Sequence, residues 1–208
     1  MVYYETNHYS KEYGLFKGGS FFNDGITGYP LDLHSTESSD GNVSTHKAAN
    51  EIMCLSTNCI YYMAYKALAD MAEIFSKRQS ADEYDSKADS VKHSINKYMW
   101  NNERGMYSYI LYPDGRLDNS QEGAGNLFAV LFDVCDDERA HTVLENIKVE
   151  KYGMPSIYEP FDGFSSYEKP ARHNNLIWPH INSFYITAAS KVKRADLLEQ
   201  ELNKITSL

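Results

Sequence analysis

Apolar residues recur with a helical period from about Lys47 to Lys77, and this pattern limits what the chain can fold into more than any other feature. A period of about 3.6 residues aligns side chains along one face of a helix. A second helical pattern runs from Ser80 to Tyr98, and Ser80 with Glu83 fits a capping box at its start. The sequence therefore predicts two long helices joined by a short link.

Four further helical patterns follow, so that six predicted helices form three hairpin-like pairs. They cover about 122–133, 136–147, 175–192 and 194–206. Antiparallel helix pairs whose long loops gather at one end are the units of an α/α toroid, in which the loops carry the chemistry. We therefore predict an all-α fold that forms part of such a toroid.

Two regions depart from the helical pattern. Residues 1–50 are rich in Gly, Ser, Thr, Asn and Asp, and we expect them to be mostly loop. Residues 98–115 combine alternating aromatic residues with Pro-Asp-Gly, which predicts a small β-hairpin with Gly105 and Gly115 at the turns. The whole chain, 1–208, has the size of a single domain.

Composition excludes several classes of partner. The net charge of −9 and the lack of any Lys/Arg run argue against nucleic acid. No window is apolar for the ~18 residues of a membrane span, and the N-terminus lacks the pattern of a signal peptide. We expect a soluble protein whose compartment is either the cytoplasm or the periplasm.

The three cysteines give no sign of a metal site. Cys54, Cys59 and Cys135 form no CxxC pair and have no neighbouring His at ligand spacing. We interpret all three as small buried hydrophobic residues. The sequence suggests neither a metal nor an organic cofactor.

Two loop segments combine the side chains that recognise sugars. Residues 156–163 and 172–182 bring carboxylates, amides, imidazoles and one Trp before an apolar helical run. Sugar hydroxyls pair with Asn, His and carboxylate groups, and sugar C–H faces stack on aromatic rings. Residues 18–30 supply another carboxylate within a Gly-rich turn. Two carboxylates from distant loops are what glycoside hydrolysis requires.

These motifs resemble a known family. His173-Asn-Asn-Leu-Ile-Trp-Pro-His180 resembles the HNGxxWP signature of debranching-type six-hairpin, (α/α)6-barrel glycosidases, and residues 98–107 are similar to their WdeerGfY segment. Glu122-Gly-Ala-Gly125 before a helix also matches. The shared order, from about residue 14 onward, is similar to the family 63 processing α-glucosidases, trehalases and glycogen-debranching enzymes.

The resemblance implies a catalytic pair. The family's general base lies in a segment like sisENYdp, which aligns Glu159, and its general acid lies in a segment like sGwDnSP, which aligns Asp24. This chain has Pro160 after Glu159 and a longer gap after Asp24 than the family pattern. Glu168 is the alternative base. The simpler interpretations are an Asp-Gly turn residue for Asp24 and solvated loop acids for Glu159 and Glu168.

Other residues are candidates for substrate binding. Trp178 is a candidate stacking wall for a sugar, or a packing residue beside Pro179 at a helix start. Glu122 would bind sugar hydroxyls, or would simply favour the positive end of a helix dipole.

The same two loops contain three further candidates for substrate binding, namely His173, Asn174 and Tyr158. We expect His180 to lie in the core or behind the site. An acid at Asp24 would need burial among Phe21, Phe22 and Tyr29.

We expect a glycoside hydrolase that acts on an α-glucoside or related α-glycoside by inversion. Two alternatives stay open: a non-catalytic carbohydrate-binding half-barrel, and an inverting phosphorylase with Lys169 and Arg172 near its phosphate. A complete barrel has twice as many helices as this chain is predicted to form. The resemblance therefore implies the C-terminal half of a barrel, completed by further chain or in a homo-oligomer.

Overall fold

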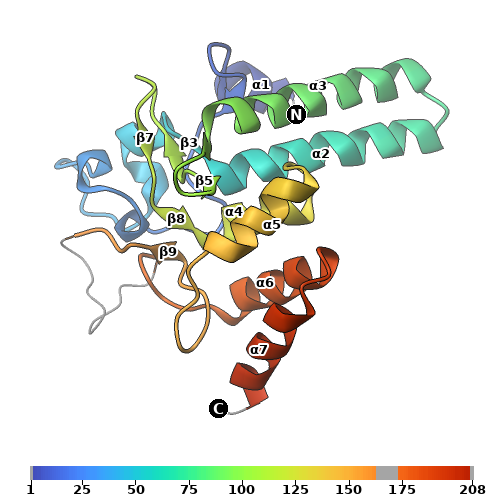
Figure 1. The fold of residues 1–208 in the computed structure, drawn as a ribbon. Coiled ribbons are helices and arrows are strands. Elements are labelled where there is room, and N and C mark those ends of the chain that lie inside the picture. Colours follow the sequence, from blue (N-terminus) through green and yellow to red (C-terminus); the bar gives the residue numbers. More distant parts are fainter. Residues whose placement is uncertain (1, 163–172, 207–208) are drawn as a thin grey trace.

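The computed structural model describes residues 2–162 and 173–206, and it is mainly helical (Figure 1). Within those residues the α-helices are α1 (Val2–Asn7), α2 (Leu55–Ile74), α3 (Arg78–Tyr98), α4 (Gly123–Leu131), α5 (Asp137–Asn146), α6 (Pro179–Lys191) and α7 (Ala195–Thr206). The predicted helical class is confirmed.

Three helical hairpins stand side by side. The pairs are α2–α3, α4–α5 and α6–α7, and in each pair the two helices pack on one another. Helix α4 also packs between α2 and α6 (Figure 1). The three predicted pairs are therefore present, and their first helices form a continuous row.

The same backbone motif ends the first helix of every hairpin. Ser76, Asp133 and Lys193 have φ of 55°, 57° and 61°, in the left-handed region. After α2, the Ser76 amide donates to Glu73 O at 2.8 Å and the Lys77 amide donates to Ala72 O at 2.8 Å. This pair of bonds is a Schellman motif, which satisfies carbonyls at the end of a helix.

This tight link explains why the predicted capping box at Ser80 is wrong. Helix α3 begins at Arg78, directly after the Schellman motif, so that Ser80 already lies inside the helix. Lys77 takes the N-cap position and its side chain makes no capping hydrogen bond.

Helix α2 begins later than its apolar pattern. Lys47–Asn50 forms a 3-10 turn, and β3 (Met53–Cys54) pairs with β6 (Ile110–Leu111), which in turn pairs with β7 (Leu117–Asp118). Pairing with β6 satisfies backbone groups that a helix would otherwise use. Likewise α6 begins at Pro179 rather than near 175, because residues 173–175 form a turn.

The predicted hairpin region contains two hairpins. One pairs β4 (Trp100–Asn101) with β5 (Met106–Tyr107), and the other is β6–β7. Gly105 and Gly115 lie in the turns with φ of 61° and 85°, as predicted. A further pair joins β8 (Gln121–Glu122) to β9 (Ile157–Tyr158), two segments far apart in sequence.

The N-terminal segment is loop-rich, as expected, with some additional structure. Helix α1 was not predicted, and β1 (Tyr9–Ser10) pairs with β2 (Leu15–Phe16). The remainder contains four short 3-10 turns, at Ile26–Gly28, Leu31–Leu33, Val43–Thr45 and Lys47–Asn50. This segment covers one end of the helical hairpins (Figure 1).

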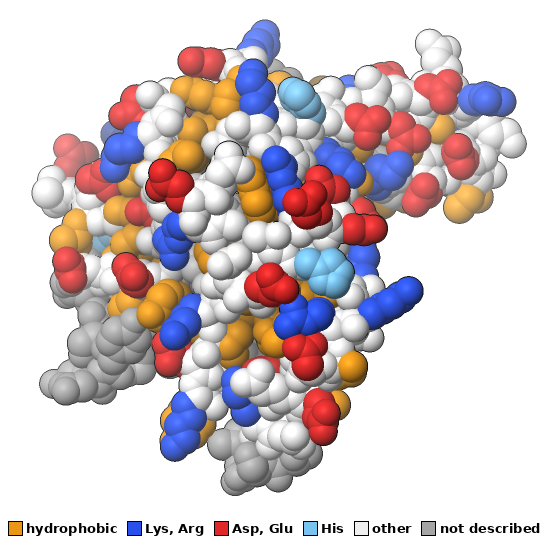
Figure 2. All heavy atoms as spheres, viewed as in Figure 1, with side chains coloured by type: hydrophobic (Ala, Val, Ile, Leu, Met, Phe, Trp, Pro, Cys, Tyr) orange, Lys and Arg blue, Asp and Glu red, His pale blue; other side chains and the backbone are white. Residues whose placement is uncertain are grey.

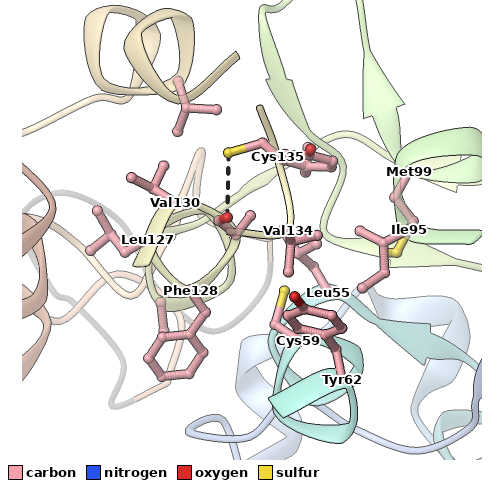
Figure 3. Packing of buried hydrophobic residues seen from close by; sticks show 14 of the residues in the cluster. Leu55, Cys59, Tyr62, Ile95, Met99, Leu127, Phe128, Val130, Val134 and Cys135 are labelled. Atoms are coloured by element: carbon pink, nitrogen blue, oxygen red, sulfur yellow. Dashed lines mark hydrogen bonds between the residues drawn. The ribbon is translucent and has the colours of Figure 1, made fainter. Parts of the chain in front are cut away.

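The main core lies between the first helices of the hairpins and α3. Figure 3 shows Leu127, Phe128 and Val130 of α4 beside Leu55 and Cys59 of α2, and other core residues come from α3 and the link after α4. The three cysteines are buried and unpaired, so their interpretation as hydrophobic core residues is confirmed. Cys135 donates its thiol hydrogen to Ala129 O at 3.3 Å (Figure 3).

The visible surface mixes both signs of charge. On the face in Figure 2, Lys and Arg side chains lie among Asp and Glu side chains, including on the projecting α2–α3 hairpin. None of the helices described is long and apolar enough to cross a membrane.

The left-handed link gives a stability prediction. Ser76→Gly should raise the free energy of unfolding by up to about 1 kcal/mol, because glycine avoids the cost of left-handed backbone but also gains freedom in the unfolded chain. Ser86→Gly, in the exposed face of α3, should instead lower it by about 0.5 kcal/mol. Urea unfolding of both variants checks the opposite signs. Two variants that both destabilise would contradict the prediction.

Candidate active site

A loop of residues 18–25 lies across the starts of α2, α4 and α6. The Thr57 hydroxyl donates to Gly19 O at 2.6 Å, and the Phe21 amide donates to the Ser56 hydroxyl at 3.0 Å. The Phe22 ring lies 4.9 Å from the His180 ring, at the start of α6, and 5.9 Å from Phe128 of α4. The loop therefore contacts all three helices.

Glu122 supports this loop from below. It is the N-cap of α4 and is 1 % exposed. Its Oε1 accepts a short hydrogen bond from the Ser20 hydroxyl, and its Oε2 accepts one from the Ser56 amide at 3.1 Å. Ser56 lies in the first turn of α2, so the Glu122 carboxylate satisfies an amide that the helix itself leaves unpaired.

Burial dominates the charge state of Glu122. Loss of hydration raises the pKa of Glu122 to about 7, although the hydrogen bonds from Ser20 and Ser56 favour the ionised form. None of the ion pairs found in residues 2–162 and 173–206 includes this carboxylate. Its negative charge therefore has hydrogen-bond donors as partners rather than a cation.

Asp24 lies at the tip of the loop and contacts His173. The distance from Asp24 Oδ1 to His173 Nε2 is 3.0 Å, with the carboxyl side chain 77 % exposed and the imidazole 8 % exposed. A Cβ at Gly25 would collide with the His173 ring, and one at Gly28 would lie 2.9 Å from His173 O. Both glycines are thus required by the close approach of this histidine.

The segment that carries Glu159 packs against the residues around His173. The Ser156 hydroxyl donates to His173 O at 3.1 Å, and the Ser156 amide donates to Leu176 O at 2.9 Å. Asn174, fully buried, accepts from the Phe161 amide and donates to Phe161 O, both at 2.8 Å. Residues on both sides of Glu159 are therefore fixed, and the Glu159 side chain is exposed.

An open hollow of about 550 Å³ lies between the loop and the start of α6. Its walls are mainly aromatic or ionisable: they comprise Phe21, Phe22, Asp24, His173, Trp178, Pro179 and His180. The Trp178 ring meets the His173 ring edge-on at 5.2 Å and lies 5.3 Å from the His180 ring. Aromatic walls with a carboxylate and imidazoles suit a ligand that has both C–H faces and hydroxyl groups.

The structure brings only part of the predicted site together. Asp24, His173 and Trp178 line one hollow, and Asn174 holds the backbone beside Glu159. Tyr158 lines a different hollow, together with Tyr152, Asn175 and Leu176. Glu122 does not reach either surface, because it is buried beneath the loop. Glu168, Lys169 and Arg172 lie outside the described residues.

Two expectations about this site are wrong. Asp24 is not buried among Phe21, Phe22 and Tyr29, because Tyr29 points inward: its hydroxyl accepts from the Ser20 amide at 2.7 Å and donates to Asn23 O at 2.6 Å. His180 is not a core residue, because Pro179 and His180 begin α6 at an exposed edge of the hollow.

Sequence reasoning missed the supporting roles of Ser20 and Ser56. Both residues are buried and their hydroxyls lie 3.1 Å apart beside Glu122. Serine is common in loops and at helix starts, so neither position stands out in the sequence. In the parts of the chain that the structure describes, no group of three or more His, Cys, Asp or Glu side chains is arranged to hold a metal ion.

The fold defines this chain as part of an α/α toroid, and comparison with known proteins gives its family. Residues 27–208 match the mannosylglycerate hydrolase MGH1-like glycoside hydrolase domain. The chain belongs to this glycoside hydrolase family. The resemblance to six-hairpin glycosidases is thereby confirmed.

One curated relative is N,N'-diacetylchitobiose phosphorylase from Vibrio proteolyticus. It is 25 % identical over 154 residues, which make up 66 % of this chain and 19 % of the relative. The chain therefore spans about a fifth of that protein's length.

Three solved structures share the fold. A mannosylglycerate hydrolase of glycoside hydrolase family 63 from Thermus thermophilus has a TM-score of 0.59 and 15 % identity, over 77 % of this chain and 40 % of its own. A neutral trehalase from Saccharomyces cerevisiae has a TM-score of 0.59 and 14 % identity, over 71 % of this chain and 29 % of its own. A sialidase has a TM-score of 0.71 and 16 % identity, over 98 % of this chain and 18 % of its own. The partial toroid is thereby confirmed.

The buried carboxyl of Glu122 predicts a pH effect on stability. Between its unfolded value, near 4.5, and about 7, folded Glu122 keeps a proton that the unfolded chain has released, so the protein loses stability as the pH rises through this range. Glu122→Gln abolishes this titration. The free energy of unfolding of the variant, relative to the unmodified protein, should therefore rise by up to about 3 kcal/mol between about pH 4.5 and about pH 8.

Denaturant unfolding at the two pH values measures this difference. The ionisable groups around Glu122 are Cys54, Cys59, Tyr29 and Tyr109, and burial raises the pKa of each well above its usual value, so they stay neutral over the range. The exposed Glu73→Gln variant should show a nearly constant difference. A constant difference for Glu122→Gln as well would contradict the prediction.

Proposed function

We propose that this chain carries the acid and base loops of an inverting glycoside hydrolase that acts on α-glucosides or related α-glycosides. The observation that carries the proposal is the hollow in which Asp24, His173 and Trp178 meet, beside the fixed segment that holds Glu159. Family membership supports glycoside hydrolysis in general.

In this proposal Asp24 is the general acid. It would donate a proton to the departing glycosidic oxygen, and its contact with His173 at 3.0 Å would orient the carboxyl group for that transfer. Trp178 would stack on a sugar face, and His173 and His180 would bind hydroxyl groups.

Glu159 is the proposed general base. As a carboxylate it would remove a proton from the water that attacks the anomeric carbon, on the face opposite the departing group. Inverting enzymes leave roughly 6.5–9.5 Å between the two carboxyls to admit that water. Such a spacing calls for two rigidly related loops, and the bonds from Ser156 and Asn174 supply rigidity on the Glu159 side.

Phosphorolysis is a second candidate, favoured by the phosphorylase from Vibrio proteolyticus among the relatives. In that case phosphate would replace water as the nucleophile and Glu159 would not be needed as a base. Lys169 and Arg172 remain the proposed phosphate ligands.

The catalytic pair can be tested by paired substitutions. Asp24→Asn and Glu159→Gln should each lower kcat on an unactivated α-glycoside by at least about 10²-fold with the fold intact, because each removes one partner in proton transfer. With 4-nitrophenyl α-glucoside, Asp24→Asn should recover activity, because a good leaving group hardly needs an acid. Glu159→Gln should not recover.

The measurement is sugar release from maltose, trehalose and mannosylglycerate, with and without inorganic phosphate. Glu168→Gln is the matched control for Glu159→Gln. If only Glu168→Gln loses activity, Glu168 is the general base instead of Glu159. Activity only with phosphate would favour the phosphorylase. Binding by calorimetry without any release would favour a carbohydrate-binding half-barrel and refute hydrolysis.

We also propose that further helices complete the toroid, either from a second copy or from additional chain. Met71, Ile74 and Phe75, at the end of α2, are 54 %, 78 % and 68 % exposed. Clustered apolar side chains of this kind usually contact a partner. Light scattering on the 208-residue chain should therefore show a dimer or larger species, and a monomer that binds no hydrophobic dye would contradict this.

A further inference from the structure

Glu122 connects the two segments that carry the proposed catalytic carboxyls. On one side its carboxylate binds the loop of Asp24: Oε1 accepts from the Ser20 hydroxyl, four residues before Asp24. Oε2 accepts from the Ser56 amide, and the Ser56 hydroxyl in turn accepts from the Phe21 amide at 3.0 Å. One side chain thus fixes the root of this loop through two serines.

On its other side the backbone of Glu122 binds the segment of Glu159. In the β8–β9 ladder Glu122 pairs with Ile157, and Gln121 pairs with Tyr158. The Gly123 amide donates to Ser156 O at 3.0 Å. Strand β9 ends at Tyr158, so the Glu159 side chain projects from the residue directly after this ladder.

The surroundings of the carboxylate leave it little freedom. A Cβ at position 125 would collide with Glu122 Oε2 and lie 2.9 Å from the Leu55 side chain, so a larger residue there would displace the carboxylate or Leu55. The side chain makes no capping hydrogen bond within α4. Its polar contacts are directed to Ser20 and Ser56 instead. A carboxylate in an apolar environment is costly unless it is fully hydrogen-bonded, and an apolar residue would fill the same space without that cost.

We propose that Glu122 is a positioning residue that sets the placement of Asp24 relative to Glu159. Its carboxyl holds the Asp24 loop while its backbone holds the Glu159 strand, so one residue determines how the two loops are spaced. The inference rests on the proposed function, because it takes Asp24 and Glu159 as the acid and the base. It replaces direct sugar binding as the role of Glu122.

The test compares Glu122→Ala and Glu122→Gln with Gln121→Ala. Gln121 is the adjacent residue of β8 and is equally buried, but its side chain bonds Lys148, at 2.6 Å and 3.0 Å, and not the Asp24 loop. A Gln at 122 can still accept from the Ser56 amide and donate to the Ser20 hydroxyl, since a hydroxyl both donates and accepts. The Ala variant loses both bonds.

The first readout is hydrogen exchange of backbone amides, which needs no substrate. Glu122→Ala should speed exchange in residues 18–25 by at least about tenfold, because this loop loses the carboxyl that supports it. Residues 156–159 should keep their protection, because the backbone pairing of β8 with β9 is unchanged. Gln121→Ala should speed exchange near Lys148 and leave residues 18–25 unchanged. Unchanged exchange in residues 18–25 of Glu122→Ala would overturn the proposal.

The second readout is the kinetics on an α-glycoside that the unmodified protein hydrolyses. Glu122→Ala should lower kcat by about 10²-fold with little change in KM, as expected when catalytic groups are misplaced by about 1 Å. Glu122→Gln should retain most of kcat, and Gln121→Ala should behave like the unmodified protein. Equal losses in Glu122→Ala and Gln121→Ala would reduce Glu122 to a packing residue and refute the proposal.

Two further arms keep the test decisive. If Glu122→Ala does not fold, Ser20→Ala is the substitute, because it removes the contacts of the Ser20 hydroxyl with Glu122 and Ser56 and keeps the β8–β9 ladder. It should lower kcat while exchange in residues 156–159 stays normal, and an unchanged kcat would then overturn the proposal. If the unmodified protein hydrolyses no glycoside, the proposed function fails, and hydrogen exchange alone decides whether the Glu122 carboxyl holds residues 18–25.

Discussion

A carboxylate removed from water has to find hydrogen-bond donors, and in this protein that requirement organises the end of the helical hairpins where the site lies. Glu122 is the N-cap of α4. Its carboxylate accepts one hydrogen bond from the Ser56 amide at the start of α2 and another from the Ser20 hydroxyl in the loop above. The loop that carries Asp24 is therefore positioned by the same contact that joins two neighbouring helices. Burial raises the pKa of Glu122 to about 7, because the ionised form has lost its hydration and the hydrogen bonds from Ser20 and Ser56 only partly replace it.

The helical scaffold leaves the site free to vary. Each hairpin turns through a left-handed residue in a Schellman motif, so the two helices of a pair are joined by only a few residues at one end. The long connections are all at the opposite end, before α2, α4 and α6. Packing of α4 between α2 and α6 brings these connections together. A glycoside hydrolase family can therefore keep its helices and change its loops.

The candidate site was only partly predictable from the sequence. The motifs around Asp24, His173 and Trp178 indicated segments that do line one hollow, because short polar motifs before helices survive as local patterns. They did not show that Glu122 is buried beneath the loop or that His180 lies at an exposed edge of the hollow. The burial of Glu122 depends on how residues 18–25 cross the helix ends, and that crossing is set by contacts between residues far apart in the sequence.

The sequence by itself determined the helical class, the three hairpins and the turns at Gly105 and Gly115, because apolar period and glycine backbone freedom are local properties. Only the tertiary structure decided where α2 and α3 begin. Residues 53–54 pair with residues 110–111, so α2 begins later than its apolar pattern. The left-handed conformation of Ser76 makes the link after α2 so short that α3 begins at Arg78, before Ser80. The tertiary structure also decided the surroundings of Glu122. Whether a carboxylate binds substrate or supports a loop depends on which hydrogen-bond donors the fold brings to it.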